Sequence, residues 1–292
     1  MERFVDEAFL QRLANLRFIV KGRRKGRLSG LHVSPRAGVS LEFADYRPYA
    51  PGDDFRYIDW NVYGRLDRIL VKTFVHETDL PIYLLVDTSA SMRVGAPSKL
   101  HYAARLAAAM AYLGLRGLDR VGFYPFSEHL GITVAPRHGM GHLGRIFRAL
   151  QDLEATGSTS LNDGLVEFLN QTRESGLVFL ISDFLTPGGY EEGIERLLHR
   201  GDEPVVVQVL DPEDLHPSAS GTVKLIDAET ARRQTLTVGT RTLREYGERL
   251  DDLRQSLARF LTERGIPYFV AATDVPLVQL IHHDLRMGGV LR

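Results

Sequence analysis

Three side chains that could bind a metal ion follow an apolar run near residue 87. Asp87, Ser89 and Ser91 occupy alternate positions directly after the run Pro81–Val86. The continuous apolar character of that run predicts a strand buried on both faces of a parallel sheet. Ligands bind such sheets at the carboxyl ends of the strands. The three side chains are therefore expected at the functional edge of the sheet.

Two further segments supply oxygen atoms to the same edge. The apolar run Leu177–Ile181 ends in Ser182 and Asp183, and Thr159 lies in a Gly/Ser/Thr-rich loop before a predicted helix. Two carboxylates with several hydroxyls, without sulfur or imidazole, suit a hard divalent cation, Mg²⁺ first, with Mn²⁺ or Ca²⁺ as alternatives. The structural alternative for Asp87 and its serines is a capping turn, because Asp and Ser favour helix starts.

The elements that must position these residues alternate between strands and helices from about Leu80 onward. This alternation predicts an α/β fold with a doubly wound, mostly parallel sheet of the Rossmann type. The predicted strands are Pro81–Val86, Val121–Phe126, Leu177–Ile181, Pro204–Leu210 and Ile266–Ala272, with Ile132–Ala135 beside the second of them. The predicted helices are Ser98–Leu115, Leu143–Leu153, Leu161–Leu169, Tyr190–His199, Leu243–Leu261 and Val275–Leu285.

Two parts of the chain depart from this alternation. Residues 1–77 are expected to form an N-terminal extension that contains β-strands, and residues 78–292 the α/β domain. Within the extension we expect a helix over Phe9–Val20 and strands over Gly38–Phe43 and Ile69–Phe74. Within the domain, a β-hairpin insertion is expected at about 220–240, around the acidic turn Asp227–Glu229.

Composition narrows the classes of function. The 292 residues contain no cysteine, which excludes disulfides, zinc thiolate sites and cysteine nucleophiles. The formal charge of −1 is the sum of a basic N-terminal segment and an acidic remainder. This near balance of charges argues against a dedicated nucleic-acid-binding protein, which usually carries an excess of basic residues. No apolar run approaches the ~20 residues of a membrane helix, and no signal-peptide core is present. A cytoplasmic protein without a transmembrane segment is expected.

The five candidate ligands Asp87, Ser89, Ser91, Thr159 and Asp183 resemble a known metal site. Their order and spacing are similar to the metal-ion-dependent adhesion site of von Willebrand factor A domains, over about residues 80–285. The resemblance implies that three hydroxyls and two aspartates bind one divalent metal, directly or through water. It also implies that an Asp or Glu of a partner protein completes the coordination.

A second stretch, over residues 43–60, resembles the signature of the bacterial domain-of-unknown-function 58 family. Its charged residues Asp53, Asp54, Arg56 and Asp59 are followed by Trp60, the only tryptophan of the chain. We expect them to have a structural role, with Arg56 close to the aspartates and Trp60 anchoring the N-terminal part onto the α/β domain. Family resemblance implies a MoxR-type AAA+ ATPase as the partner.

These features favour a non-catalytic adaptor that binds a partner carboxylate through a divalent metal and acts in protein remodelling or complex assembly. The alternative is a Mg²⁺-dependent, phosphatase-like hydrolase with Asp87 as the nucleophile. Dehalogenase-type phosphatases carry a second Asp two residues later, where this chain has Ser89. A second metal site at His138 and His142 is disfavoured by the glycines between them.

Overall fold

The computed structural model describes residues 7–19, 26–27, 42–51, 53, 55–76, 81–186, 188–229 and 232–292. The chain divides into two compact units. One comprises Met1–Val20 with Leu80–Arg292, and the other comprises Lys21–Asp79. No helix among the described residues is both long enough and apolar enough to cross a membrane.

The larger unit is built around a six-stranded sheet with the strand order β11-β8-β7-β4-β5-β6. Its five parallel strands are β4 (Ile82–Asp87), β5 (Val121–Phe126), β7 (Leu177–Ser182), β8 (Glu203–Leu210) and β11 (Tyr268–Ala272). The edge strand β6 (Val134–Arg137) pairs antiparallel with β5. The expectation of a mostly parallel α/β sheet is therefore confirmed.

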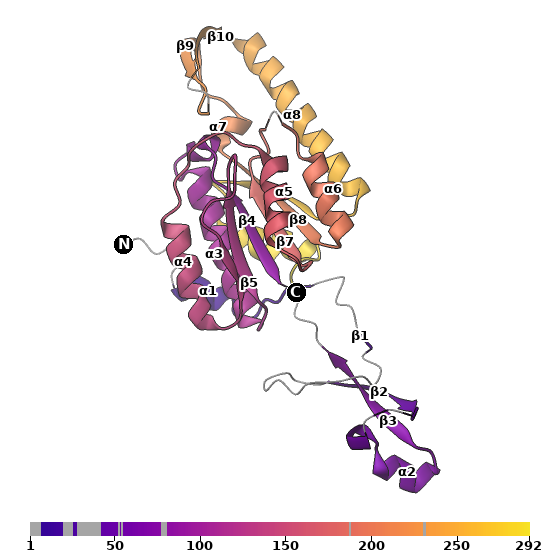
Figure 1. The fold of residues 1–292 in the computed structure, drawn as a ribbon. Coiled ribbons are helices and arrows are strands. Elements are labelled where there is room, and N and C mark those ends of the chain that lie inside the picture. The colour runs from indigo at the N-terminus through magenta and orange to yellow at the C-terminus, as the bar shows by residue number, and fades with distance from the viewer. Residues whose placement is uncertain are drawn as a thin grey trace. The chain divides into compact units, whose positions relative to one another are not determined.

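Helices cover both faces of this sheet (Figure 1). On one face lie α1 (Glu7–Leu13), α3 (Lys99–Arg116), α4 (Leu143–Gln151) and the C-terminal helix, which runs through α9 (Leu277–Gln279), a π-helical turn (Leu280–Asp284) and α10 (Leu285–Met287). On the other lie α5 (Leu161–Gln171), α6 (Glu191–Arg200) and α8 (Thr240–Glu263).

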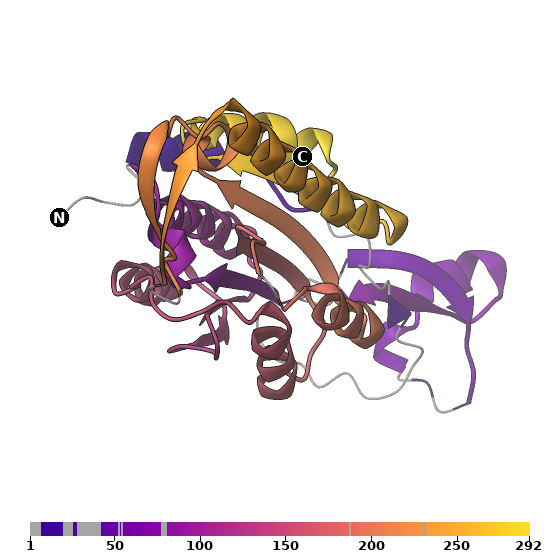
Figure 2. The same cartoon turned by 90° about the horizontal axis from the view of Figure 1, so that it is seen from above.

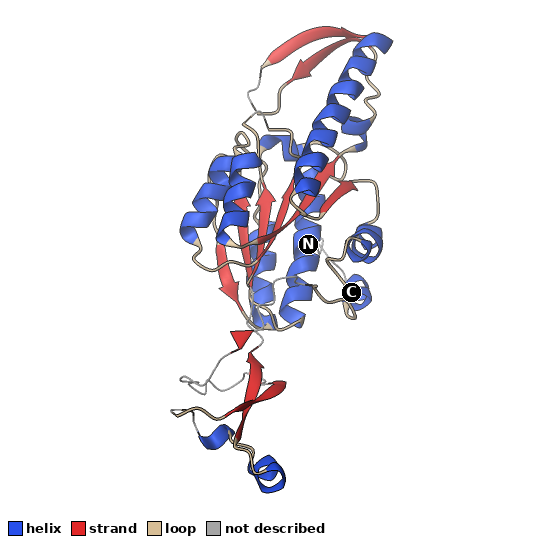
Figure 3. Ribbon diagram, turned by 90° about the vertical axis from the view of Figure 1, so that its right-hand side faces the viewer, coloured by secondary structure: helices blue, strands red, loops and turns tan. Residues whose placement is uncertain are grey.

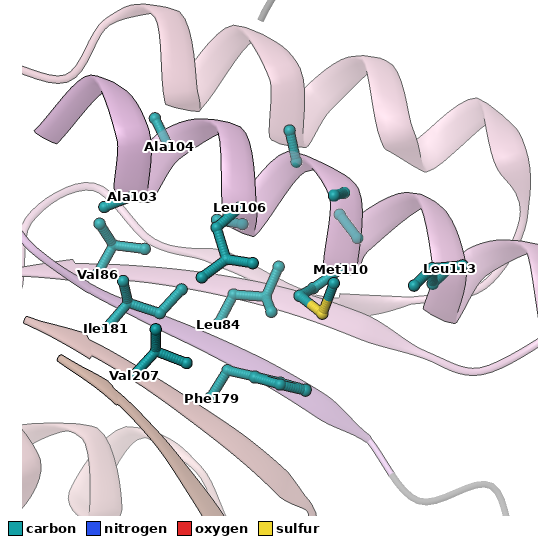
Figure 4. Packing of buried hydrophobic residues seen from close by; sticks show 14 of the residues in the cluster. Leu84, Val86, Ala103, Ala104, Leu106, Met110, Leu113, Phe179, Ile181 and Val207 are labelled. Atoms are coloured by element: carbon teal, nitrogen blue, oxygen red, sulfur yellow. The ribbon is translucent and has the colours of Figure 1, made fainter. Parts of the chain in front are cut away.

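Two apolar clusters hold the layers together, because alternate residues of each strand point to opposite faces. Leu84 and Phe179 are buried against Leu106 and Met110 of α3 (Figure 4). Leu85 belongs to the cluster on the opposite face, together with residues of α5, α6 and α8. Burying one such side chain stabilises the fold by roughly 1.5–3 kcal/mol, so the strands that carry the candidate site are held firmly.

The start of the chain corrects the expected domain boundary. The pattern of the sequence predicts one extension over residues 1–77, but α1 packs its apolar side chains into the core of the larger unit. The expected helix up to Val20 ends at Leu13. Beyond it, Phe18 forms a β-bridge with Leu291, and the amide of Arg17 donates to the carbonyl of Arg292 at 3.2 Å. This pairing with the C-terminus requires extended backbone, which ends the helix early.

An antiparallel hairpin, β9 (Gly221–Ile226) and β10 (Arg233–Val238), lies between α7 (Pro212–Leu215) and α8. It occupies the region where the sequence predicts an inserted hairpin. The hairpin projects beyond the end of the central sheet, and α8 begins where it ends (Figures 2 and 3).

The smaller unit contains a three-stranded antiparallel sheet in the order β1-β3-β2. The strands are β1 (Gly26–Arg27), β2 (Glu42–Pro48) and β3 (Leu70–His76), and η1 (Phe55–Tyr57) and α2 (Trp60–Leu66) lie between the last two. Of the expected strand over Gly38–Phe43, residues 38–41 lie outside the described residues. The strand at its end continues instead to Pro48, because β2 pairs with β3 along that length.

Candidate functional site

The strand order places the candidate site at a reversal of the chain path. From β4 the chain moves to its neighbour β5 on one side, and later to its neighbour β7 on the other. Parallel α/β sheets open a crevice at the carboxyl ends of strands where the winding reverses in this way. Asp87 is the last residue of β4, and Ser182 is the last of β7, with Asp183 following it. Both predicted aspartates therefore lie at this edge.

Asp87 is fully buried and held on both carboxylate oxygens. Its Oδ1 accepts the backbone N–H of Ser89 at 2.8 Å, and its Oδ2 accepts the hydroxyl of Ser182 at 2.6 Å. Burial, and after it the nearby charge of Asp183, raises the pKa of Asp87 to about 7. The carboxylate is thus unfavourable in this position without a compensating cation, since burial and like charge both disfavour ionisation.

The two predicted serines lie on the loop after β4. Ser89 is fully buried, and its hydroxyl oxygen lies 3.0 Å from that of Ser91 at the start of a 3₁₀ turn, Ala90–Arg93. The amide of Ala90 donates to the carbonyl of Gly157 at 2.9 Å, and Gly157 has a φ of +77° that favours glycine. This backbone bond joins the serine loop to the loop that carries Thr159.

Thr159 is nearly buried, and its hydroxyl donates to Oε1 of Glu229 at 2.9 Å. Its backbone carbonyl accepts the hydroxyl of Thr186, which follows β7. Thr159 is therefore fixed between the end of β7 and the turn of the β9–β10 hairpin. The sequence predicts only an acidic turn over Asp227–Glu229, and the contact of Glu229 with Thr159 is apparent only in the structure.

A buried lysine, Lys99, lies beside Asp183 and is not among the predicted site residues. Lys99 is 1% exposed, and its Nζ lies 2.8 Å from Oδ2 of Asp183 and 3.1 Å from Oδ2 of Asp214. Burial alone lowers the pKa of Lys99, but the two carboxylates outweigh it and raise the pKa above its ordinary value. Lys99 begins a helix whose other inward positions are apolar, such as Tyr102, Ala103 and Leu106. A lysine at an inward-facing position of an otherwise apolar helix face is the sequence feature that could have identified Lys99.

Two oxygen–oxygen distances in the site equal both ordinary hydrogen-bond lengths and the spacing of adjacent ligands around a small octahedral cation. Adjacent ligands of an octahedral Mg²⁺ with bonds of 2.0–2.1 Å lie about 2.9 Å apart. The Ser89–Ser91 and Thr159–Glu229 oxygen pairs are separated by 3.0 and 2.9 Å. In charge, Asp87, Asp183 and Asp214 exceed the single ammonium of Lys99 by two when all are ionised, which a divalent cation would balance.

In the described part of the chain, the candidate site included, no three His, Cys, Asp or Glu side chains gather closely enough to hold a metal ion. His138 and His142 instead hydrogen-bond to the backbone carbonyls of Leu118 and Val121, at 2.9 and 3.0 Å.

The signature residues of the smaller unit shape its backbone. Asp59 caps α2 by accepting the amides of Asn61 and Val62, and it also accepts the hydroxyl of Tyr46 at 2.8 Å. Asp53 accepts the amide of Ala50 at 2.8 Å in the preceding turn. These contacts support a structural role for both aspartates.

Trp60 and Arg56 lie at the surface of the smaller unit. Trp60 is 62% exposed, with its ring edge-on to Tyr63. Arg56 is exposed. Asp54 lies outside the described residues.

The chain matches the family model described as "Protein of unknown function DUF58" over residues 45–255. It is 27% identical to the uncharacterized proteins Rv1480 of Mycobacterium tuberculosis and Mb1516 of Mycobacterium bovis, over 92% of this chain and 86% of each of theirs.

Among solved structures, the conserved hypothetical protein BatB from Bacteroides thetaiotaomicron is similar at a TM-score of 0.45, with 16% identity over 72% of this chain and 98% of BatB. An aerotolerance-related membrane protein from Bacteroides fragilis has a TM-score of 0.41, with 14% identity over 71% of this chain and 99% of that one. With TM-scores below 0.5, neither likeness bears on the function of this chain.

Proposed function

The chain belongs to the DUF58 family, and we propose that it is a non-catalytic adaptor whose α/β unit is a von Willebrand factor A-like domain. Its adhesion-type site, formed by Asp87, Ser89, Ser91, Thr159 and Asp183, holds a divalent metal, with Mg²⁺ preferred over Mn²⁺ or Ca²⁺. The metal binds an Asp or Glu of a partner protein. The sequence resemblance supports a MoxR-type AAA+ ATPase as that partner, in protein remodelling or complex assembly.

One observation carries the proposal. Two fully buried aspartates, Asp87 and Asp183, lie at the reversal point of the sheet, and the hydroxyls of Ser89 and Ser91 on the adjoining loop lie 3.0 Å apart. A metal bound mainly by neutral hydroxyls keeps positive character. It therefore attracts a carboxylate from outside, which is the chemistry of binding rather than of turnover.

We expect metal-dependent binding of the purified chain to a purified MoxR-type AAA+ ATPase from the same genome. In biolayer interferometry without nucleotide, the complex should form in Mg²⁺, disappear in EDTA and return with Mn²⁺, because the metal bridges the two proteins. Equal binding in Mg²⁺ and EDTA would contradict the bridging role. Failure to bind in every condition would instead remove this ATPase as the partner.

The hydrolase alternative has less support from the geometry. A nucleophilic Asp must reach a substrate atom, but Asp87 is fully buried with both oxygens hydrogen-bonded. We therefore expect no Mg²⁺-dependent hydrolysis of p-nitrophenyl phosphate above the rate of the Asp87→Asn variant. Turnover that the wild-type chain shows and this variant lacks would replace the adaptor proposal with the hydrolase.

A further inference from the structure

Large apolar side chains gather on the surface of the smaller unit, between the end of β2 and the start of β3. This group, which we call the apolar tip, consists of the exposed residues Phe55, Trp60, Tyr63, Leu66 and Ile69. Phe55, Trp60 and Leu66 are 69%, 62% and 63% exposed, and the rings of Trp60 and Tyr63 lie edge-on with centroids 6.2 Å apart. A single exposed leucine is ordinary, but a group of exposed large apolar residues marks an interaction surface.

The apolar tip lies at one end of the three-stranded sheet. At this end Pro48 pairs with Leu70, and the amide of Asp59 donates to the carbonyl of Leu70 at 3.0 Å, which folds the intervening segment against the strand ends. At the opposite end, Gly26 of β1 pairs with His76 of β3 (Figure 1). The six residue steps from Leu70 to His76 correspond to about 20 Å of strand. The tip therefore lies away from β1 and from the end of β3, which border the larger unit in the sequence.

The exposed charges around the apolar tip are mostly positive. Among the described residues of 49–69, a single carboxylate is exposed, that of Asp67, and three guanidinium groups are exposed, those of Arg56, Arg65 and Arg68. The other two described aspartates of this segment are buried and accept backbone amides, as given above. Such a surface complements one that combines apolar groups with negative charge.

Three kinds of partner differ in how well they match these features. A symmetric contact with a second copy would bring the arginines of both copies together, and like charges repel. A protein partner would need a pocket shaped for the rings, whereas all residues of 60–69 except Val62 are exposed, so the segment projects from the unit. A lipid bilayer receives projecting aromatic rings at its interface without a shaped pocket, and its anionic headgroups attract arginines.

We propose that the apolar tip docks the chain on the surface of a bilayer that contains anionic phospholipids. The rings of Phe55, Trp60 and Tyr63 lie among the headgroups, and the exposed arginines contact lipid phosphates. Docking of this kind needs no membrane-spanning helix. It also involves no residue of the candidate metal site, so the inference does not depend on the proposed adaptor function and can fail or succeed separately from it.

Trp60 is the only tryptophan of the chain, so its fluorescence reports on the apolar tip directly. The full chain is titrated with vesicles of equal parts phosphatidylglycerol and phosphatidylcholine, and with vesicles of phosphatidylcholine alone. With the anionic vesicles we expect the emission to shift to shorter wavelength and the ring to become protected from acrylamide. Phosphatidylcholine alone should give a much weaker response, and added salt should weaken binding to the anionic vesicles because it screens the arginines.

Variants of exposed residues separate the two contributions in vesicle co-sedimentation. Arg65→Gln and Arg68→Gln should each lower partitioning onto anionic vesicles about 5-fold, as one positive charge near the surface is lost. Leu66→Ser should lower it about 10-fold, because less apolar surface is removed from water. The matched controls are Arg249→Gln on α8 and Ile132→Ser, which removes an 89% exposed isoleucine from the larger unit. Both controls should partition as the wild-type chain does.

Several results would overturn the inference. Trp60 emission that neither kind of vesicle changes excludes docking through the tip, and equal losses in the tip variants and the controls place the contact elsewhere. Equal binding to both kinds of vesicle removes the role of the arginines. Emission that is already protected from acrylamide without vesicles shows that the tip is covered by the chain or by a second copy. A shift caused by the purified ATPase but not by vesicles makes the tip a protein interface instead.

Discussion

Asp87→Asn is expected to lower the affinity for Mg²⁺ by at least about 100-fold while the protein stays folded. The substitution keeps the size of the side chain but removes one of the two fully buried carboxylates of the site. The amide oxygen can still accept the backbone N–H of Ser89, and the hydroxyl of Ser182 can turn to accept from the amide nitrogen. Calorimetric titration with Mg²⁺ measures the affinity, and thermal unfolding in EDTA measures the fold.

The pH dependence of stability provides a second readout of the same residue. The pKa of Asp87 is about 7 in the folded, metal-free chain, against the ordinary value of 3.8 for an aspartate in water, so the folded state binds the extra proton. The contribution of Asp87 to the stability of the metal-free protein is therefore fully present near and below pH 4, declines as the pH rises toward 7 and is lost above it, a total change of about 4 kcal/mol. Asp87→Asn lacks this decline and should be at least as stable as the wild-type chain at pH 8 in EDTA.

Asp252→Asn, on the exposed side of α8, is the matched control and should change neither Mg²⁺ affinity nor the pH profile. Unchanged Mg²⁺ affinity in Asp87→Asn would contradict the metal site. A pH profile shared by the variant and the wild-type chain would show that another group causes the decline.

The second large effect is expected for Lys99→Met in the absence of metal. Lys99 is the buried cation between Asp183 and Asp214, and its raised pKa keeps it charged through the neutral range. Methionine has a similar length but leaves the buried carboxylate of Asp183 without its counter-charge. Breaking a buried ion pair from one side costs about 3–5 kcal/mol, so the variant should unfold well below the wild-type temperature in EDTA.

Mg²⁺ should restore much of this loss. A divalent cation beside Asp183 replaces the missing positive charge, and the ammonium no longer repels it. The difference in melting temperature between Mg²⁺ and EDTA should thus be larger for Lys99→Met than for the wild-type chain. Lys224→Met, which removes an exposed lysine from β9, is the control and should change stability by no more than about 0.5 kcal/mol. A Mg²⁺ gain no larger than that of the wild-type chain would place the metal away from Lys99.

The elements that carry the candidate site could be predicted from the sequence because their signals are local. Uninterrupted apolar runs mark β4 and β7, and each run stops where the first polar residue appears, at Asp87 and at Ser182. Since parallel strands end at one edge, the pattern alone predicted that Asp87 and Asp183 lie at the same edge of the sheet. The signature around Asp53 and Asp59 led to the family for the same reason, as a contiguous stretch.

Contacts between segments that are distant in the sequence could not be predicted from such local patterns. The Lys99–Asp183 pair spans 84 residues and the Thr159–Glu229 pair spans 70, and neither has a periodic or local pattern. The place of the first helix in the larger unit depends likewise on pairing between Arg17 and the C-terminus.

By itself, then, the sequence determined the strands and the oxygen chemistry at their ends, because hydrophobic periodicity and strand termination are properties of neighbouring residues. Only the tertiary structure decided which charged side chains lie next to these oxygen atoms. It brings Lys99 to Asp183 and the hairpin turn to Thr159, because burial of a cation or a carboxylate is settled by packing across the whole unit. Those two contacts place a buried cation and a further carboxylate next to the candidate ligands.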